Sequence, residues 1–202
     1  QLARAGIKPG RVYSGDMERQ KDTATLALKS MGHVQSVKAL SAFNEYDSDS
    51  VFAAFLPAVL SEHPDIRDRI TPDDYSLLKD RDVFRRLFFP VMSRWIQGHS
   101  AGGIDHESWS DFNARVVGGL KEIRAEIEGD ECAVVFTSGG VISTSLTHVL
   151  GMDPTRSAEF NWRTANASIT KFMCTDDGFE LEGYNNYAHL HSGENGLRVT
   201  YL

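Results

Sequence analysis

The run Val12–Ala24 constrains the fold of this 202-residue chain more than any other feature. An apolar strand end finishes at Ser14, a turn follows, and a helix opens with Asp16 and carries Arg19 in its first turn. Unpaired backbone N–H groups and the positive end of the dipole make such a helix start attractive to anions. A guanidinium there adds a planar, permanently charged donor that suits phosphate. The run therefore indicates an anion site, and the plainer interpretation is a strand-to-helix junction with a solvated Arg.

A second strand–turn–helix unit is predicted further along the chain. The short apolar run Ala133–Phe136 is typical of a buried parallel strand, and it leads through Thr137–Gly140 into a helix over 141–150. Glycines in such a turn let backbone N–H groups approach an anion closely. Paired glycines also occur at many α/β turns that bind nothing, so the turn alone is a weak signal of a site.

The remaining patterns predict helices in the middle of the chain and a hairpin near its end. The sequence Asp176-Asp177-Gly178 separates two β-rich runs and is typical of a hairpin turn. The periodicity of apolar residues and the turn signals predict these elements: a helix over 17–31 closed by Gly32, a helical stretch over 50–97 with an internal start at Thr71–Asp74, a helix over 107–127, and strands over 167–175 and 179–184. Residues 50–105 are expected to form a helical insert over one side of an α/β core.

Composition excludes several classes of protein. The formal net charge is −7, from 21 Lys and Arg against 28 Asp and Glu, which argues against a nucleic-acid binder. No apolar run approaches the roughly 18 residues of a membrane span, and no signal peptide is visible, so a cytoplasmic location without a membrane partner is expected. The two cysteines, Cys132 and Cys174, are expected to be buried thiols rather than a disulfide or a metal site.

The pattern Tyr-Ser-x-x-Met-x-Arg-x-x-x-Thr-Ala over residues 13–24 resembles the second signature of the histidine phosphatase superfamily, the phosphoglycerate mutase-like proteins. The resemblance implies that Arg19 is a phosphate-binding Arg and that Ser14 flanks the phosphate. It also implies a three-layer α/β fold, with a mostly parallel sheet between helices. The implied activity is that of a phosphohydrolase or mutase, which acts on a small phosphomonoester through a phosphohistidine without a metal or cofactor.

The resemblance extends to two further segments. Glu45 matches the family position of the general acid, with Asp47 as the fallback, and the plain interpretation is a solvated loop acid. Thr137, Ser138 and Gly139 match the turn that holds phosphate oxygens. The family usually has His where this chain has Ser138, and a serine can donate one hydrogen bond to phosphate but brings no positive charge.

The family's first strand ends in an Arg-His-Gly motif whose His is phosphorylated, and no such motif occurs in these 202 residues. We expect an upstream segment to supply it, in which case residues 1–202 form a single domain that lacks its first strand. The alternative function is a phospholigand-binding or interaction module of the same fold that has lost catalysis, and Ser138 is the reason to consider it.

The resemblance continues to the end of the chain in Asn166–Thr170 and Asn185–Leu190, similar to the C-terminal signature of the phosphatase-like branch. His189 in this signature is interpreted as structural. His99 and His106 flank a glycine loop and are expected to be solvated. No cluster of His, Cys and Asp has the spacing of metal ligands. The resemblance implies a small phosphorylated substrate or inorganic phosphate as the partner.

Overall fold

The computed structural model describes residues 1–70, 76–191 and 199–201. The chain divides into two compact units, one made of Gln1–Glu45 with Asn113–Leu202 and the other of Tyr46–Phe112. The single domain with an insert over 50–105 remains a prediction.

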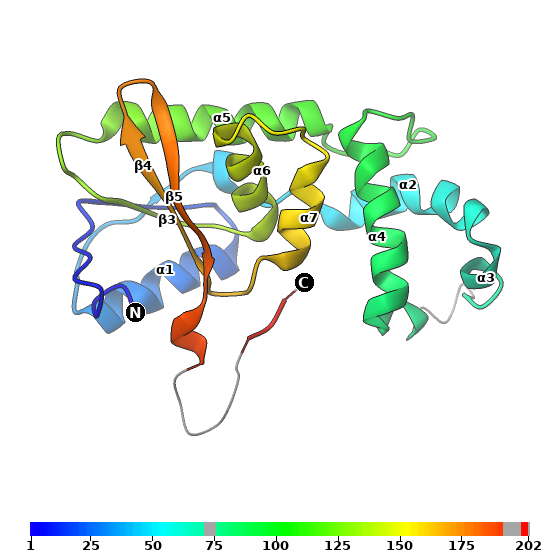
Figure 1. The fold of residues 1–202 in the computed structure, drawn as a ribbon, viewed down its shortest axis with the longest axis horizontal. Helices are drawn as coiled ribbons and strands as arrows, with labels where there is room; N and C mark the ends of the chain where they lie inside the picture. The colour runs from blue at the N-terminus through cyan, green and yellow to red at the C-terminus, as the bar shows by residue number, and fades with distance from the viewer. Residues whose placement is uncertain (71–75, 192–198, 202) are drawn as a thin grey trace. The chain divides into compact units, whose positions relative to one another are not determined.

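Helices and short strands make up most of the described chain, and the described elements between β2 and β3 are all helical (Figure 1). In chain order the elements are β1 (Arg11–Ser14), α1 (Glu18–Met31), β2 (Lys38–Ala39), η1 (Ser41–Phe43), α2 (Ser48–Glu62), α3 (Pro64–Arg67), η2 (Ser76–Lys79), α4 (Arg81–Ile96), α5 (Trp109–Glu126), β3 (Ala133–Phe136), α6 (Gly139–Val149), α7 (Arg156–Arg163), β4 (Ile169–Thr175), β5 (Gly178–Asn186) and η3 (Ala188–Leu190).

A parallel sheet with the order β2-β1-β3 is the centre of the larger unit. Strand β1 is its middle strand, and Val12, Tyr13 and Ser14 are buried, as a strand covered on both faces requires. In Figure 1, α1 lies below these strands and α5 above them. The predicted α/β fold, a parallel sheet flanked by helices, is therefore confirmed.

The hairpin β4–β5 forms a separate two-stranded antiparallel sheet. Its turn is Asp176-Asp177, and both strands agree with the prediction to within two residues. Strand β3 pairs with β1 along one edge, and no described strand pairs with its other edge. Every residue of β3 is half-buried rather than buried, because the strand has a neighbour on one side alone. The prediction of a buried strand here was wrong in that respect.

The prediction of buried thiols was also wrong, since Cys132 and Cys174 are both exposed and unbonded. Cys132 precedes β3, and Cys174 lies on β4 next to the exposed Met173. Burial nevertheless raises the pKa of the Cys132 thiol, and the positive charge of Lys171 on β4 opposes the shift. This interaction indicates that the start of β3 and the middle of β4 approach one another.

The sequence located most helices and missed one. Helix α1 ends at Gly32 with φ 68°, and its two closing backbone bonds run to Leu28 and Lys29, as a C-terminal glycine predicts. The helical stretch over 50–97 consists of α2, α3, η2 and α4, and Pro90 lies inside α4. The predicted start at Thr71–Asp74 lies outside the described residues. Helix α7 was not predicted. Among the described helices, none is long and apolar enough to cross a membrane.

The unit of residues 46–112 has an aromatic core. Trp95 is 1% exposed, and its ring centroid lies 4.7 Å from that of Tyr46, 5.1 Å from Trp109 and 5.6 Å from Phe112. The Trp95 indole N–H donates to the carbonyl of Glu107 at 2.8 Å, so the one polar group of the ring is satisfied. The remaining buried apolar residues come from α2, α3 and α4: Val51, Phe55, Val59, Ile66, Leu87, Phe88, Val91 and Met92.

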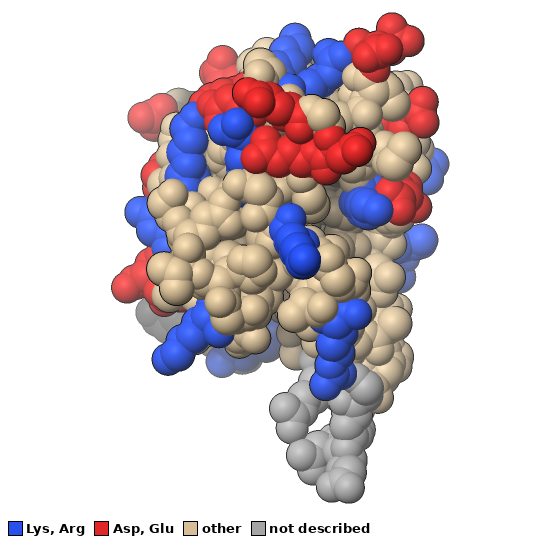
Figure 2. Space-filling view, turned by 90° about the vertical axis from the view of Figure 1, so that its left-hand side faces the viewer, with Lys and Arg blue, Asp and Glu red and all other residues tan. Residues whose placement is uncertain are grey.

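An ion-pair network joins β1, β2 and α5 in the larger unit. The Lys38 ammonium contacts Glu126 at 2.5 Å and Glu122 at 2.9 Å, and the Tyr13 hydroxyl donates to Glu126 at 2.7 Å. The hydrogen bonds from Lys38 and Tyr13 hold the pKa of Glu126 below its usual value. Figure 2 shows the face seen from this end of the molecule, where acidic and basic side chains lie side by side across its upper part and fewer charged side chains lie below them.

This network predicts how stability depends on pH. A carboxyl group with a lowered pKa in the folded state stabilises the fold above its unfolded pKa, and the contribution is lost as pH falls through the folded value. We therefore expect the melting temperature to fall below about pH 4.5, the ordinary pKa of a glutamate, and Glu126→Gln to reduce that fall. Circular dichroism melts from pH 3 to 7 measure both. Asp130→Asn on the exposed loop is the control, and an equal change in both variants contradicts the prediction.

Candidate active site

The two predicted anion-binding turns lie side by side at one edge of the sheet. Strands β1 and β3 are parallel neighbours with Ser14 opposite Phe136, so both end at the same level. The backbone N–H of Gly15 donates to the carbonyl of Phe136 at 3.2 Å and ties the two turns together. Ligand sites of α/β sheets lie at this carboxyl edge. The pairing of β1 and β3 therefore brings the start of α1 beside the start of α6.

The first turn of α1 is arranged differently from the sequence expectation. Met17, rather than Asp16, is the N-cap residue, and no side chain caps the helix. The Asp16 backbone N–H donates to the side-chain oxygen of Asn44 at 2.6 Å, and the Asn44 amide donates back to the Asp16 carboxylate at 3.2 Å. Arg19 is exposed, and within the described ranges no carboxylate or carbonyl contacts its guanidinium. The guanidinium is therefore available to a ligand.

The start of α6 already holds a carboxylate. Ser138 is the N-cap residue without a side-chain cap, which leaves the first backbone N–H groups to other acceptors. The N–H of Gly140 donates to Glu45 Oε2 at 2.8 Å. A Cβ on Gly139 would lie 2.4 Å from the Asn161 side-chain oxygen, so this turn requires glycine for a close approach. The carboxylate of Glu45 lies where an anion meets a helix N-terminus.

Side chains from three elements hold the segment that carries Glu45. The carbonyl of Phe43 accepts from the Gln20 amide at 3.1 Å and from the Thr137 hydroxyl at 2.8 Å. The Arg115 guanidinium on α5 contacts the segment from another side. It donates to the carbonyls of Asn44 at 2.7 Å, of Ala42 at 3.1 Å and of Ser41 at 3.2 Å. These bonds fix the backbone, and with it the position of the Glu45 carboxyl group beside α6.

Gln20 is the residue of this site that the sequence analysis missed. It is 3% exposed, and its amide donates to Ser138 Oγ at 2.9 Å as well as to Phe43. The signal that could have found it is helical spacing, because Gln20, Ala24 and Leu28 are the buried residues of α1 and recur every four residues. A polar side chain on a buried stripe needs partners, and here these partners are the other two segments of the site.

Other candidates have positions that suit structural roles. Ser14 is fully buried, and its hydroxyl has no hydrogen-bond partner in the described structure. Asp47 caps α2 through the N–H groups of Asp49 and Ser50. Its carboxylate also accepts from the Ser50 hydroxyl, and this bond, together with the backbone bonds, lowers the pKa of the carboxyl. Asp47 is therefore occupied as a helix cap, which leaves Glu45 as the acid beside the turn.

The histidines lie elsewhere. His189 is in η3, and His99 contacts the side chain of Gln97 at 3.1 Å. His106 contacts the carbonyl of Ile104 at 2.8 Å, and its ring packs edge-on against Phe55. Within the ranges that the structure describes, no group of three or more His, Cys, Asp or Glu residues could hold a metal ion.

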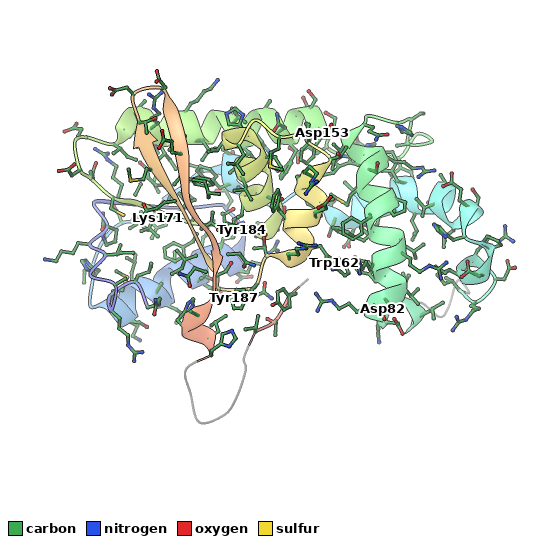
Figure 3. The ribbon with its side chains drawn as sticks, in the orientation of Figure 1. Asp82, Asp153, Trp162, Lys171, Tyr184 and Tyr187 are labelled. Carbon is green, nitrogen blue, oxygen red and sulfur yellow. The ribbon has the colours of Figure 1, made fainter. Side chains whose placement is uncertain are left out.

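Two hollows on the described surface are lined by other residues. One of about 410 Å³ is on α4, lined by Asp82, Arg85, Arg86, Phe89 and Pro90. The other, of about 520 Å³, lies at the end of β5 beside Tyr187, which Figure 3 places below Tyr184 and Lys171 of the hairpin. Neither hollow includes a predicted site residue. The candidate site therefore consists of the hydrogen-bonded turns that follow β1 and β3.

The close packing at Gly15 makes it a sensitive position. A Cβ there would lie 1.9 Å from Gln20 Oε1, 2.7 Å from the Phe43 carbonyl oxygen and 2.8 Å from Asn44 Oδ1. We expect Gly15→Ala to lower the free energy of unfolding by about 1–3 kcal/mol, the usual cost of overpacking. Urea unfolding followed by circular dichroism measures this change.

Gly118→Ala is the matched control for Gly15→Ala. Gly118 is an exposed residue of α5, and a Cβ there would meet no atom within 4 Å. Alanine is the better helix former, so the control is expected to gain roughly 0.5–1 kcal/mol. If Gly15→Ala unfolds at the same urea concentration as the unmodified protein, the packing described at this turn is wrong.

Comparison with solved structures supports the fold. A phosphoglycerate mutase from Bacillus anthracis matches 92% of this chain and 76% of its own with a TM-score of 0.61 and 19% identity. Bacillus stearothermophilus YhfR matches 93% of this chain and 80% of its own, with a TM-score of 0.62 and 13% identity. A mycobacterial glucosyl-3-phosphoglycerate phosphatase in complex with inorganic phosphate matches 91% and 82%, with a TM-score of 0.53 and 20% identity.

Comparison of the sequence with curated proteins finds no match. The family model of the histidine phosphatase superfamily (branch 1) matches residues 74–187, which is more than half of the chain. This match agrees with the enzyme class that the signatures of the sequence imply. The chain belongs to the histidine phosphatase superfamily, branch 1.

Proposed function

We propose that the protein is a phosphohydrolase or phosphomutase that acts on a small phosphomonoester at the carboxyl edge of β1 and β3. The observation that carries the proposal is the contact between Glu45 and the start of α6, 2.8 Å from the Gly140 N–H. The start of α6 holds a carboxylate, and the neighbouring start of α1 carries the available guanidinium of Arg19, so the two helix starts together have the donors that a phosphate group needs. The mycobacterial phosphatase structure contains inorganic phosphate and has the same fold, which supports phosphate as the ligand.

The residues of the site take these roles in the proposal. Arg19 binds the phosphate oxygens, and Thr137, Ser138 and Gly139 form the turn that donates to them. Glu45 acts as the general acid, because a protonated carboxyl beside the turn can transfer its proton to the leaving oxygen. The negative charge is neutralised by the guanidinium and backbone donors, so no residue of the site is assigned to a metal.

The nucleophile in this proposal is a histidine from a segment upstream of Gln1. Strand β3 has one edge that no described strand pairs with, and β4–β5 form a separate sheet. A strand inserted there would satisfy backbone groups that are otherwise unpaired, and its carboxyl end would reach the same edge as Ser14 and Ser138. The imidazole nitrogen attacks phosphorus while the bond to the leaving oxygen breaks and Glu45 protonates that oxygen. Water then hydrolyses the phosphohistidine and returns a proton to Glu45.

Turnover of an aryl phosphate by the natural full-length protein tests this function. We expect hydrolysis that a chelator does not inhibit and that depends on Arg19. If the natural protein has an intact mass of 22.4 kDa, that of these residues alone, and still hydrolyses the aryl phosphate, the proposed upstream histidine is wrong.

A second candidate function is that of a phospholigand-binding module without catalysis. Ser138 favours it, because a serine at the position of the family's histidine brings no charge to the transferred phosphoryl group. Calorimetry with inorganic phosphate, run beside the turnover assay, separates the two functions. Binding without hydrolysis, unrepaired by Ser138→His, supports the module and contradicts the enzyme.

A further inference from the structure

The side chain of Gln20 connects all three segments of the candidate site. It lies in the first turn of α1, and its Nε2 donates to the carbonyl of Phe43 at 3.1 Å and to Ser138 Oγ at 2.9 Å. Gln20 is 3% exposed, so these bonds form away from water. Buried side-chain amides are usually fully bonded because an unsatisfied polar group costs free energy.

The orientation of this amide is determined by its neighbours. The Phe43 carbonyl oxygen can only accept, so the NH₂ end of Gln20, and not its oxygen, must face it. The amide oxygen lies instead against Gly15, where an added Cβ would be 1.9 Å away, and it accepts no hydrogen bond in the described structure. An amide nitrogen carries two hydrogens, and the bonds to Phe43 and Ser138 use both.

This orientation decides the direction of the bond to Ser138. Because Gln20 donates, Ser138 Oγ accepts, and the single hydroxyl proton of Ser138 points elsewhere. Among the described residues nothing accepts that proton, and Ser138 makes no side-chain cap to α6. Ser138 is half-buried at the start of α6, next to the N–H of Gly140 that donates to Glu45.

We propose that Gln20 is a positioning residue that makes Ser138 a hydrogen-bond donor to the bound phosphate. This inference rests on the proposed phosphate site. Phosphate oxygens accept hydrogen bonds, so a serine whose proton went to a neighbouring acceptor would present lone pairs to the ligand and weaken its binding. The Gln20 amide prevents that arrangement, and Ser138 adds one neutral donor to the charged contact that Arg19 makes.

A double-mutant cycle on inorganic phosphate binding tests the inference. We expect Ser138→Ala to weaken phosphate binding about two- to tenfold, the value of one hydrogen bond. Gln20→Met, which keeps the length of the side chain but removes both donors, is expected to weaken binding by a similar factor. The double variant Gln20→Met/Ser138→Ala is expected to bind no more weakly than the weaker of the two single variants, since Gln20 acts through Ser138. Isothermal titration calorimetry at one pH and ionic strength measures all four proteins.

A purely structural role for Gln20 gives a different result. If Gln20 only holds the Phe43–Glu45 segment, Gln20→Met weakens binding by the same factor with serine or alanine at position 138, and this additive outcome overturns the inference. Thermal melts show whether Gln20→Met is folded. If it is not, Gln20→Glu at pH 8 replaces it. The carboxylate of the introduced glutamate accepts the Ser138 proton and reverses the direction of the hydrogen bond. Gln20→Glu must therefore weaken phosphate binding less when residue 138 is alanine than when it is serine. An equal loss in both backgrounds overturns the inference.

Failure of the underlying site is distinguishable from failure of the inference. If the unmodified protein binds no phosphate, or if Arg19→Ala binds it equally well, the proposed phosphate site is wrong and the role of Gln20 fails with it. If phosphate binds and depends on Arg19 while Gln20→Met has no effect, the site is right and the role of Gln20 alone is wrong.

Discussion

Arg19→Ala is expected to weaken phosphate binding by about 2–5 kcal/mol, because it removes a charged bidentate donor from a partly desolvated anion. The guanidinium of Arg19 has no partner among the described residues, so its removal leaves no buried charge behind in the ligand-free protein. We therefore expect the free energy of unfolding to stay within about 0.5 kcal/mol of the original, as for other surface substitutions. Calorimetric titration with phosphate and urea unfolding measure the two quantities.

Lys21→Ala is the control for Arg19→Ala. Lys21 is exposed in the same part of α1 and carries the same charge, but it follows Gln20 and was not assigned to the site. We expect it to change phosphate binding by less than about 0.5 kcal/mol, through long-range charge alone. If both variants lose the same free energy of phosphate binding, the binding depends on the overall positive charge of α1 and not on a contact with Arg19.

Trp95→Ala is expected to lower the free energy of unfolding of the unit Tyr46–Phe112 by about 3–5 kcal/mol, the cost of removing a large aromatic side chain from a packed core. The substitution removes the ring contacts with Tyr46, Trp109 and Phe112 and leaves the Glu107 carbonyl without its indole donor. Urea unfolding followed by tryptophan fluorescence and by circular dichroism measures the loss. Two separate transitions would mean that the two units unfold independently.

Trp95→Phe is the matched variant for Trp95→Ala. Phenylalanine keeps most of the ring contacts and loses the indole N–H, so it is expected to cost about 0.5–1.5 kcal/mol, the net value of one hydrogen bond. If both variants cost the same, the hydrogen bond to Glu107 rather than the aromatic packing determines the stability contributed by Trp95.

Local sequence signals correctly located the C-terminal end of α1 and the turn of the β4–β5 hairpin. Helix α1 ends at Gly32 because a glycine tolerates the positive φ that closes a helix, and the β4–β5 hairpin turns at Asp176-Asp177 because these residues suit a tight turn. The prediction that Asp16 opens α1 was wrong. Its backbone and carboxylate bond with Asn44, a residue 28 positions away that no local pattern could have indicated.

Burial was predicted less well than secondary structure. Cys132, Cys174 and strand β3 were expected to be buried because their sequences are apolar, but both cysteines are exposed and β3 is half-buried. Apolar composition indicates that a residue favours burial, but the number of neighbouring elements decides whether the fold provides it. For β3, a paired strand on one edge alone leaves its side chains partly in solvent.

Short runs of residues with strong local preferences are enough to predict the family, most of the helices and strands, and the two turns after β1 and β3. The contacts of Gln20 with Ser138 and Phe43, and of Glu45 with the start of α6, depend instead on the tertiary structure. These contacts link residues that are 23, 118 and 95 positions apart. The residues of each pair meet when β1 pairs with β3 and brings the turns together. No local pattern predicts such a hydrogen bond, because its donor and acceptor are far apart in the sequence and become neighbours only in the folded chain.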